Sequence, residues 1–328
     1  MTPEKMSPWV ERFTVPWWAK NPHVQTILPT LLPAPSLELR RERLNLEDSD
    51  FIDLDWLNEE APRDCIVVII HGLEGGSHSS YARRLMNRCR AHNISAVVHH
   101  HRSCSGENNR LAHSYHSGQT EDIQHTLNHI RSLHPNAKIY AVGYSLGGNA
   151  LAKYLGEQGE SSIIERAVVV SAPLLLAACA KRLESGFSTI YQRHLIKQLQ
   201  HKTADKIANP KLKSAMPIDA DQVKQLKTFH AFDDQVTAPL HGFKDVHDYY
   251  AQCSGIQFLK SIETPTLLIH SEDDPFMTEA VIPQPGQLAE CVEYELYPFG
   301  GHVGFITGGS PLRPHYFLED RIASYLQF

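Results

Sequence analysis

The chain has 328 residues with 31 basic and 37 acidic side chains, so its net charge is −6 at pH 7. No run of Lys or Arg supplies the concentrated positive charge that releases counterions from phosphates, which argues against a nucleic-acid binder. A chain of this length buries most of the surface that it exposes when unfolded, so its core needs no metal or disulfide to hold it together.

The cysteines are scattered and form no C-x-x-C pair, which is typical neither of a secreted disulfide scaffold nor of a zinc site. They are Cys65, Cys89, Cys104, Cys179, Cys253 and Cys291. Charged residues such as Glu4 and Lys5 occur where a signal peptide needs an apolar stretch. The longest nearly apolar run, Ala167–Ala180, is too short to span a bilayer. We therefore expect a cytoplasmic protein with free thiols and no stable membrane insertion.

The N-terminal segment, residues 1–36, is rich in Pro and Trp. Each Pro removes a backbone donor and restricts the residue before it, so we expect no long helix in this segment. We predict an irregular arm whose tryptophans are buried against the body of the protein. Contact of this arm with a membrane surface stays open as an alternative, although no long amphipathic helix supports it.

Strand candidates follow the arm. Leu37–Leu44 and Phe51–Leu57 are amphipathic, and the second alternates apolar and acidic residues. The later candidates are continuous, mostly apolar runs, which indicates strands buried on both faces of a sheet. These runs are Cys65–Gly72, Ile94–His101, Ala137–Tyr144, Arg166–Pro173, Thr264–Ser271 and Cys291–Pro298.

Helical patterns lie between these runs, at Tyr81–Ala91, Gln119–Leu133 and Gly147–Gly156. Buried strands that alternate with helices predict an α/β protein with a mostly parallel twisted sheet flanked by helices. No strong strand occurs between Pro173 and Pro265, and this stretch is far too long for a simple crossover. We therefore predict one domain over residues 37–328 with a helical cap inserted at about 174–261.

The segment Gly143-Tyr144-Ser145-Leu146-Gly147 lies between a predicted strand and a predicted helix. It has the G-x-S-x-G pattern of a nucleophile elbow in the setting where that motif is functional. A side chain two positions before or after the serine would collide across such a sharp turn, and glycine removes the collision. We predict that Ser145 is the nucleophile.

A serine nucleophile needs a base and an orienting acid, and in this kind of fold they follow in the order Asp or Glu, then His. Asp274 lies in the turn after Thr264–Ser271 and is the predicted acid, with Asp273 as the alternative. His302 lies in the glycine-rich stretch Gly300–Phe305 after the last predicted strand. Flexible glycines would let this loop bring the imidazole over the serine, so His302 is the predicted base.

The backbone N–H groups of Leu73 and Leu146 are predicted to form the oxyanion hole. Leu73 belongs to the glycine-rich loop after the first buried strand, and Leu146 directly follows the predicted nucleophile. We expect His71 to brace this loop through hydrogen bonds rather than to act in catalysis.

The run His99-His100-His101 suggests a metal site, but neighbouring side chains of a strand point to opposite faces and no Cys or carboxylate pair completes a ligand set. We therefore predict no metal site there. We expect Arg102, His116 and Asp122 to form a buried hydrogen-bonded network beside the pocket.

The chain resembles the YheT-type α/β-hydrolases, which are bacterial relatives of the eukaryotic α/β-hydrolase domain lipases and alcohol acyltransferases. The strings that carry this resemblance are NPHVQTILP (21–29), HGLEGG (71–76), SCSGENNR (103–110), YHSGQTED (115–122), GYSLGGN (143–149), DDPF (273–276) and GGHVGF (300–305). The resemblance extends from Trp17 to about Leu318 and implies an α/β-hydrolase fold with a triad of Ser145, Asp274 and His302. Two departures concern the polarity of the pocket: Ser103 stands where the family more often has glycine, and His101 where it usually has phenylalanine.

These residues together predict a carboxylesterase-type serine hydrolase that forms an acyl-enzyme on Ser145 and needs no cofactor. Its predicted partner is a small-molecule ester, and the Leu, Ile and Phe content of the cap favours an apolar acyl group; the sequence indicates no oligomeric state. A serine at this position excludes the chemistry of relatives that use an aspartate nucleophile. An alcohol acyltransferase or thioesterase with the same triad remains open, as does a non-catalytic ligand-binding protein of the same fold.

Overall fold

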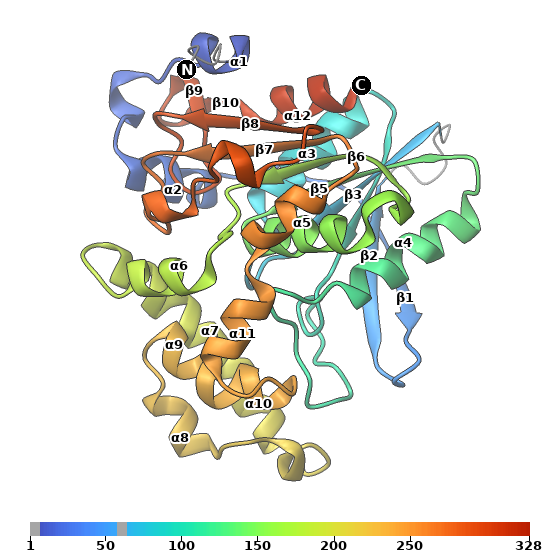
Figure 1. Cartoon of the computed structure of the whole chain (residues 1–328), viewed down its shortest axis with the longest axis vertical. Coiled ribbons are helices and arrows are strands. Elements are labelled where there is room, and N and C mark those ends of the chain that lie inside the picture. Colours follow the sequence, from blue (N-terminus) through green and yellow to red (C-terminus); the bar gives the residue numbers. More distant parts are fainter. Residues whose placement is uncertain (1–6, 58–63) are drawn as a thin grey trace.

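The computed structural model describes residues 7–57 and 64–328, so the first six residues of the predicted arm lie outside the described residues. An eight-stranded sheet forms its centre, in the order β1-β2-β4-β3-β5-β6-β7-β8 (Figure 1). The strands are β1 Arg40–Asn45, β2 Phe51–Leu57, β3 Cys65–Ile70, β4 Ser95–His99, β5 Lys138–Tyr144, β6 Ile164–Val170, β7 Thr266–Ser271 and β8 Val292–Tyr297. β2 pairs antiparallel with β1 and β4, and the other pairs are parallel.

Helices cover both faces of this sheet. α3 (Ser80–Ala91) and α12 (Leu318–Leu326) pack on one face, and α4 (Glu121–Leu133) and α5 (Leu146–Gln158) pack on the other. Successive side chains of a strand point to opposite faces, so β3 contributes to both cores and every one of its residues is buried. The continuous apolar runs of the sequence follow from this burial, and the predicted α/β class with a mostly parallel sheet is confirmed.

Helices occupy the long connection between β6 and β7, and they lie together in the lower part of Figure 1. They are α6 Leu176–Leu183, α7 Ser188–Ala208, α8 Ala220–Gln225, α9 Phe229–Phe232, α10 Ala238–Leu240 and α11 Val246–Cys253. A π-helical turn, Asp233–Thr237, joins α9 to α10. We call helices α6 to α11 the cap. It has small apolar clusters of its own, separate from the two cores of the sheet.

The prediction of an irregular N-terminal arm is wrong. The segment forms a short α1 (Pro8–Arg12) and a ten-residue helix α2 (Pro22–Leu31). α2 can form because Pro22 occupies its first turn, where no intrahelical N–H is needed, and the Asn21 side chain caps it by accepting the N–H of His23 at 2.8 Å. The expected burial of the tryptophans also fails in part, since Trp17 is 85% exposed.

The C-terminal part contains elements that the sequence did not predict. β9 (Ile306–Ser310) and β10 (Arg313–Tyr316) form a separate antiparallel hairpin, and α12 follows it. The hairpin is rich in Gly and Pro and lacks the apolar alternation of a strand pair. Within residues 7–57 and 64–328, no helix is both long and apolar enough to cross a membrane. All six cysteines are unpaired.

Candidate active site

Ser145 occupies a strained turn between β5 and α5. Its backbone angles are φ 51° and ψ −120°, a conformation that non-glycine residues rarely adopt. A Cβ on Gly143 would lie 2.6 Å from the carbonyl oxygen of Gly147. A Cβ on Gly147 would lie 2.4 Å from the carbonyl oxygens at the end of β3. The Ser145 N–H donates to the carbonyl oxygen of Val170 at 2.9 Å, which ties the turn to β6. The two glycines are therefore required by the turn that presents the serine.

Three side chains from distant parts of the chain meet at this turn. The Nε2 atom of His302 lies 2.9 Å from the hydroxyl oxygen of Ser145. The Nδ1 atom of the same ring lies 2.9 Å from the Oδ2 atom of Asp274. A carboxylate at Nδ1 holds the proton there, so the lone pair of Nε2 faces the serine hydroxyl. This geometry allows the imidazole to take the serine proton.

The two neighbouring aspartates have different contacts. Asp274 accepts the N–H of Phe276 at 2.8 Å with its second oxygen, which fixes the carboxylate beside the imidazole. Asp273 instead accepts the N–H of Gly301 at 2.8 Å, and burial raises the pKa of its carboxyl group. Asp274 thus contacts the imidazole of His302, whereas Asp273 binds the backbone of the loop that carries the histidine.

The imidazole of His302 is also held by an aromatic ring. The Phe276 ring stacks on it with centroids 4.0 Å apart and an angle of 13° between the planes. Phe276 in turn packs against Tyr191 of α7 at 4.9 Å. Tyr191 of the cap therefore reaches the histidine through the Phe276 ring that lies between them.

Tyrosine hydroxyls hold the loop that contains Leu73. The N–H of Gly72 donates to the hydroxyl of Tyr81 at 2.9 Å, and the N–H of Glu74 donates to the hydroxyl of Tyr115 at 2.8 Å. Leu73 lies between these two anchored amides. Its position is therefore fixed by the tyrosine contacts on both sides.

This loop lies directly beside the serine. A Cβ on Gly72 would lie 3.2 Å from the Cβ of Ser145. Leu146 is the first residue of α5, where the N–H groups have no partner within the helix. The side chains of Leu73 and Leu146 pack in one apolar cluster and both border the pocket that contains Ser145 and His302. The two predicted oxyanion residues thus lie together at the edge of the pocket that Ser145 lines.

His71 fixes the same loop from behind. Its Nδ1–H donates to the carbonyl oxygen of Gly72 at 2.7 Å, and its Nε2 accepts the N–H of His101 at 3.1 Å. Burial and the neighbouring histidines lower the pKa of His71, which keeps the ring neutral as these two bonds require. The bonds agree with the expected bracing role of His71.

The remaining histidines of the 99–101 run have separate partners. His99 bonds to Thr126 at 2.8 Å, and the Nε2 of His100 lies 2.8 Å from a carboxylate oxygen of Asp55. His101 bonds to the His71 carbonyl oxygen and stacks flat on Tyr115, as a phenylalanine ring could. Within the described part of the chain, no group of three or more His, Cys, Asp or Glu residues could hold a metal ion.

The expected network of Arg102, Asp122 and His116 forms only in part. Arg102 makes a two-pronged ion pair with Asp122, with both N···O distances at 2.8 Å, and also contacts Asp48 at 2.5 Å. His116 does not join this pair. Its ring lies 4.6 Å from the ring of His241 and packs on aromatic residues near the cap, so the inclusion of His116 is wrong.

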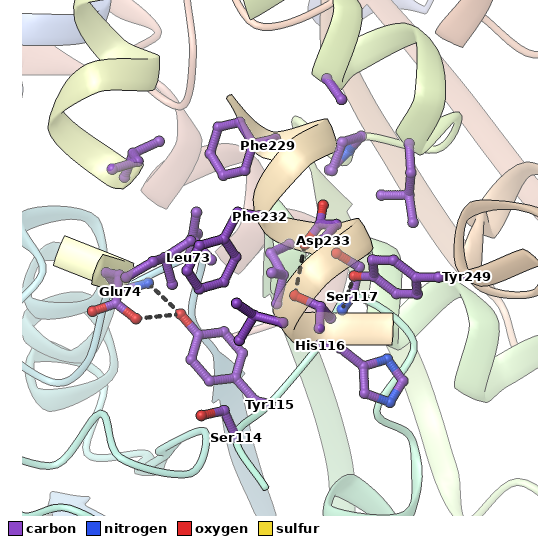
Figure 2. A pocket seen from close by; sticks show the side chains of 18 of the residues that line it. Leu73, Glu74, Ser114, Tyr115, His116, Ser117, Phe229, Phe232, Asp233 and Tyr249 are labelled. Atoms are coloured by element: carbon purple, nitrogen blue, oxygen red, sulfur yellow. Dashed lines mark hydrogen bonds between the residues drawn. The ribbon is translucent and has the colours of Figure 1, made fainter. Parts of the chain in front are cut away.

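A pocket lies between the sheet and the cap, and Ser145 and His302 are among the residues that line it. Figure 2 shows another part of its lining, from Leu73 to Tyr249. The cavity volume of the pocket is about 140 Å³, which is roughly ten times what one buried water needs. Apolar cap side chains form much of its wall: Leu176, Leu183, Leu195, Leu199, Phe229, Phe232, Val236 and Leu240. Figure 2 shows polar groups bonded within the wall, with Glu74 joined to Tyr115 and Ser117 joined to Tyr249.

An ion pair and a buried carboxyl group interrupt the apolar wall. Lys202 of α7 lies 2.8 Å from a carboxylate oxygen of Glu74, which links the cap to the Leu73 loop. Asp233 of the π-helical turn accepts the hydroxyls of Thr237 and Tyr250, each at 2.7 Å. Burial raises the pKa of Asp233 to about 6. Sequence reasoning missed Asp233, because nothing in the pattern DDQVT distinguishes a pocket wall from a helix start.

Residues 66–309 match the alpha/beta hydrolase fold family. The chain belongs to this family. YheT of Escherichia coli (strain K12), a protein provisionally named an esterase, is 44% identical over 93% of this chain and 90% of its own length. The chain described here is also 28% identical to phospholipase ABHD3 of Homo sapiens, over 93% of this chain and 76% of that protein. The resemblance that the sequence motifs indicated is confirmed.

A solved structure shows the same architecture. The esterase Pf2001 of Pyrococcus furiosus aligns over 90% of this α/β-hydrolase and 96% of its own chain, with a TM-score of 0.57 and 14% sequence identity. At this level of identity the likeness concerns the fold alone.

Proposed function

We propose that this α/β-hydrolase is a serine esterase that cleaves carboxylic esters of apolar acyl groups through an acyl-enzyme on Ser145. The contact of His302 with both the Ser145 hydroxyl and the Asp274 carboxylate, each at 2.9 Å, carries the proposal. Hydrolase activity itself is shared with relatives that are named for ester cleavage, among them phospholipase ABHD3.

The reaction begins when Ser145 attacks the ester carbonyl while His302 Nε2 takes the hydroxyl proton. Asp274 stabilises the imidazolium that forms. The N–H groups of Leu73 and Leu146 stabilise the negative charge on the carbonyl oxygen. His302 then gives its proton to the leaving alcohol, and in a second cycle it activates water, which releases the acid.

The pocket supports an apolar acyl group. Its cap wall is formed mainly by Leu and Phe side chains, which gain about 0.8 kcal/mol for each substrate methylene that leaves water. For a series of 4-nitrophenyl esters we expect kcat/KM to rise about fourfold per methylene until the pocket is filled. If kcat/KM did not change with chain length, the proposed preference for apolar acyl groups would be wrong, but the proposed roles of Ser145, Asp274 and His302 would not be affected.

Fluorophosphonate labelling tests the proposal, because this probe reacts only with an activated serine. We expect labelling of the wild-type protein at Ser145 and none in Ser145→Ala. We also expect Ser145→Ala to lose at least about a thousandfold in kcat toward 4-nitrophenyl butyrate. Ser132→Ala is the matched control, since Ser132 is exposed and, within the part of the chain that the structure describes, its hydroxyl bonds only to the His129 carbonyl oxygen of its own helical turn. Wild-type turnover in Ser145→Ala would end the proposal.

The same labelling separates the other functions left open by the sequence. A ligand-binding protein of this fold would not be labelled. An alcohol acyltransferase would be labelled but would form a new ester when an alcohol is added, so the ratio of ester to free acid in the products distinguishes it from an esterase. A thioesterase would prefer the thioester in a matched pair of substrates.

A further inference from the structure

The loop that carries His302 has a strained backbone. Val303 and Phe305 have φ angles of 65° and 45°, in the left-handed region that non-glycine residues rarely adopt. Such a conformation costs energy and persists only where the surrounding structure enforces it. The groups that enforce this loop therefore determine where the imidazole lies.

Helix α2 of the N-terminal segment holds this loop at both ends of the strained stretch. The N–H of His302 donates to the hydroxyl oxygen of Thr26 at 2.9 Å. Four residues later, Ile306 exchanges two hydrogen bonds with the Gln25 side chain: its N–H donates to Oε1 at 2.6 Å, and its carbonyl oxygen accepts from Nε2 at 3.2 Å. Gln25 is fully buried. Figure 1 shows α2, in blue, beside the red C-terminal part of the chain.

The loop is fitted to α2 by its glycines. A Cβ on Gly301 would lie 2.6 Å from the carbonyl oxygen of Pro22, and a Cβ on Gly304 would lie 1.9 Å from that of Gln25. Pro29, four residues after Gln25, has no N–H to give to this carbonyl, and the carbonyl faces Gly304 instead of being covered by a helical bond at that position. The contact is therefore backbone against backbone and leaves the loop little freedom to shift.

Thr26 itself is fixed in one orientation. Its hydroxyl donates to the carbonyl oxygen of Pro22 at 2.8 Å, so its lone pairs face the N–H of His302. Neither Thr26 nor Gln25 belongs to the described residues that line the pocket. Thr26 can therefore act on the position of the imidazole without being part of the pocket surface.

We infer that α2, through Thr26 and Gln25, is a positioning element of the active site and that Thr26 sets the place of the His302 imidazole. The inference rests on the proposed function of Ser145. A displacement of about 1 Å in a catalytic group can cost on the order of a hundredfold in rate. Loss of the Thr26 hydroxyl should therefore lower kcat and leave KM unchanged.

Two variants at the same position test this inference. Thr26→Val keeps the size and removes the hydroxyl, and we expect kcat toward 4-nitrophenyl butyrate to fall at least tenfold with KM changed less than twofold. We expect Thr26→Ser, which keeps the hydroxyl, to restore kcat to within about threefold of the wild type. The rate of fluorophosphonate labelling at Ser145 should fall in parallel with kcat in Thr26→Val.

Thr30→Val is the matched control. Thr30 lies one helical turn further along α2 and is exposed, and among the described residues its hydroxyl bonds only to the carbonyl oxygen of Ile27. We expect wild-type kcat in this variant. Equal losses in Thr30→Val and Thr26→Val would show a general effect on the helix and would overturn the inference.

The remaining outcomes are also decisive. Wild-type kcat in Thr26→Val overturns the inference while labelling of the wild type leaves the proposed function standing. If Thr26→Val does not fold, Thr26→Ala replaces it, because it adds no methyl group to the contact. If neither variant folds, or if kcat falls only with the folded fraction measured by circular dichroism, Thr26 is a residue of stability and the inference is wrong. A wild type that is not labelled overturns the proposed function itself.

Discussion

At the scale of single residues, the site depends on which aspartate faces the imidazole. Asp274 touches the ring of His302, whereas Asp273 binds the backbone N–H of Gly301 one residue before it. The two carboxylates are adjacent in sequence and both are largely enclosed, yet they hold different parts of the same loop. Their substitution should therefore separate orientation of the imidazole from support of the backbone.

We expect Asp274→Asn to lower kcat by about a thousandfold to ten-thousandfold, because an amide at Nδ1 no longer selects the proper tautomer of the imidazole. Asp273→Asn should keep kcat within about tenfold, since its amide oxygen can still accept the N–H of Gly301. Steady-state kinetics with 4-nitrophenyl butyrate measure both. The reverse order of the two losses would assign the acid to Asp273.

The sequence was sufficient to propose Ser145, Asp274 and His302, because the fold imposes their order along the chain and each follows a recognisable strand. It was not sufficient for Thr26 and Gln25. Their partners lie 276 and 281 residues away in the sequence. Such a contact depends on how one helix packs against one loop, and no local pattern encodes it.

At the scale of elements, the cap contributes a π-helical turn whose first residue, Asp233, opens onto the pocket. A π-helical turn is rare, and such turns occur often at functional sites. Here the turn allows Thr237 and Tyr250 to donate to the two carboxylate oxygens of Asp233. Burial nevertheless raises the pKa of this carboxyl group to about 6.

This raised pKa gives the stability a dependence on pH. Between about pH 4 and pH 6 the folded state keeps a proton on Asp233 that the unfolded state has lost, so the free energy of unfolding falls as the pH rises through this window. Asn cannot lose a proton. We expect the free energy of unfolding of Asp233→Asn, relative to wild type, to increase by on the order of 2–3 kcal/mol from pH 4 to pH 8. Urea unfolding of both proteins at both pH values measures this change. A difference in free energy of unfolding that stays the same at pH 4 and pH 8 would contradict the prediction.

The elements themselves were predictable to different degrees. Buried strands were found with small errors at their ends, because a strand covered on both faces needs a continuous apolar run. β1, at the edge of the sheet, begins at Arg40 rather than at Leu37. The helix α2 was missed because two of its residues are Pro, although Pro22 lies where Pro favours a helix. The β9–β10 hairpin was missed because its residues carry no strand pattern.

At the scale of the whole molecule, a buried ion pair joins both ends of the chain. Arg321 of α12 donates to both carboxylate oxygens of Glu295 in β8, at 3.0 to 3.3 Å. Ser7, at the start of α1, donates to the same carboxylate at 2.5 Å. Both ionic side chains are at most 4% exposed. Removing one partner would leave the other charge buried.

We expect Arg321→Met to lower the free energy of unfolding by about 3–5 kcal/mol. The double variant Arg321→Met/Glu295→Leu should regain more than half of this loss, because an apolar pair leaves no buried charge. Guanidinium chloride unfolding of the wild type, Arg321→Met, Glu295→Leu and the double variant gives the coupling free energy between Arg321 and Glu295. Equal stability of Arg321→Met and the double variant would contradict the prediction, because it would mean that the buried charge of Glu295 costs nothing once Arg321 is removed.

The hydrogen bond between Thr26 and His302 also has a consequence for the synthesis of the chain on the ribosome. Thr26 leaves the ribosome 276 residues before His302 does, a delay of roughly 15 to 55 s at usual rates of synthesis. During that interval α2 has no loop to hold, and the Gln25 side chain lacks its two hydrogen bonds with Ile306. A nascent chain in which the serine turn has already emerged therefore lacks the proposed base until His302 has also left the ribosome.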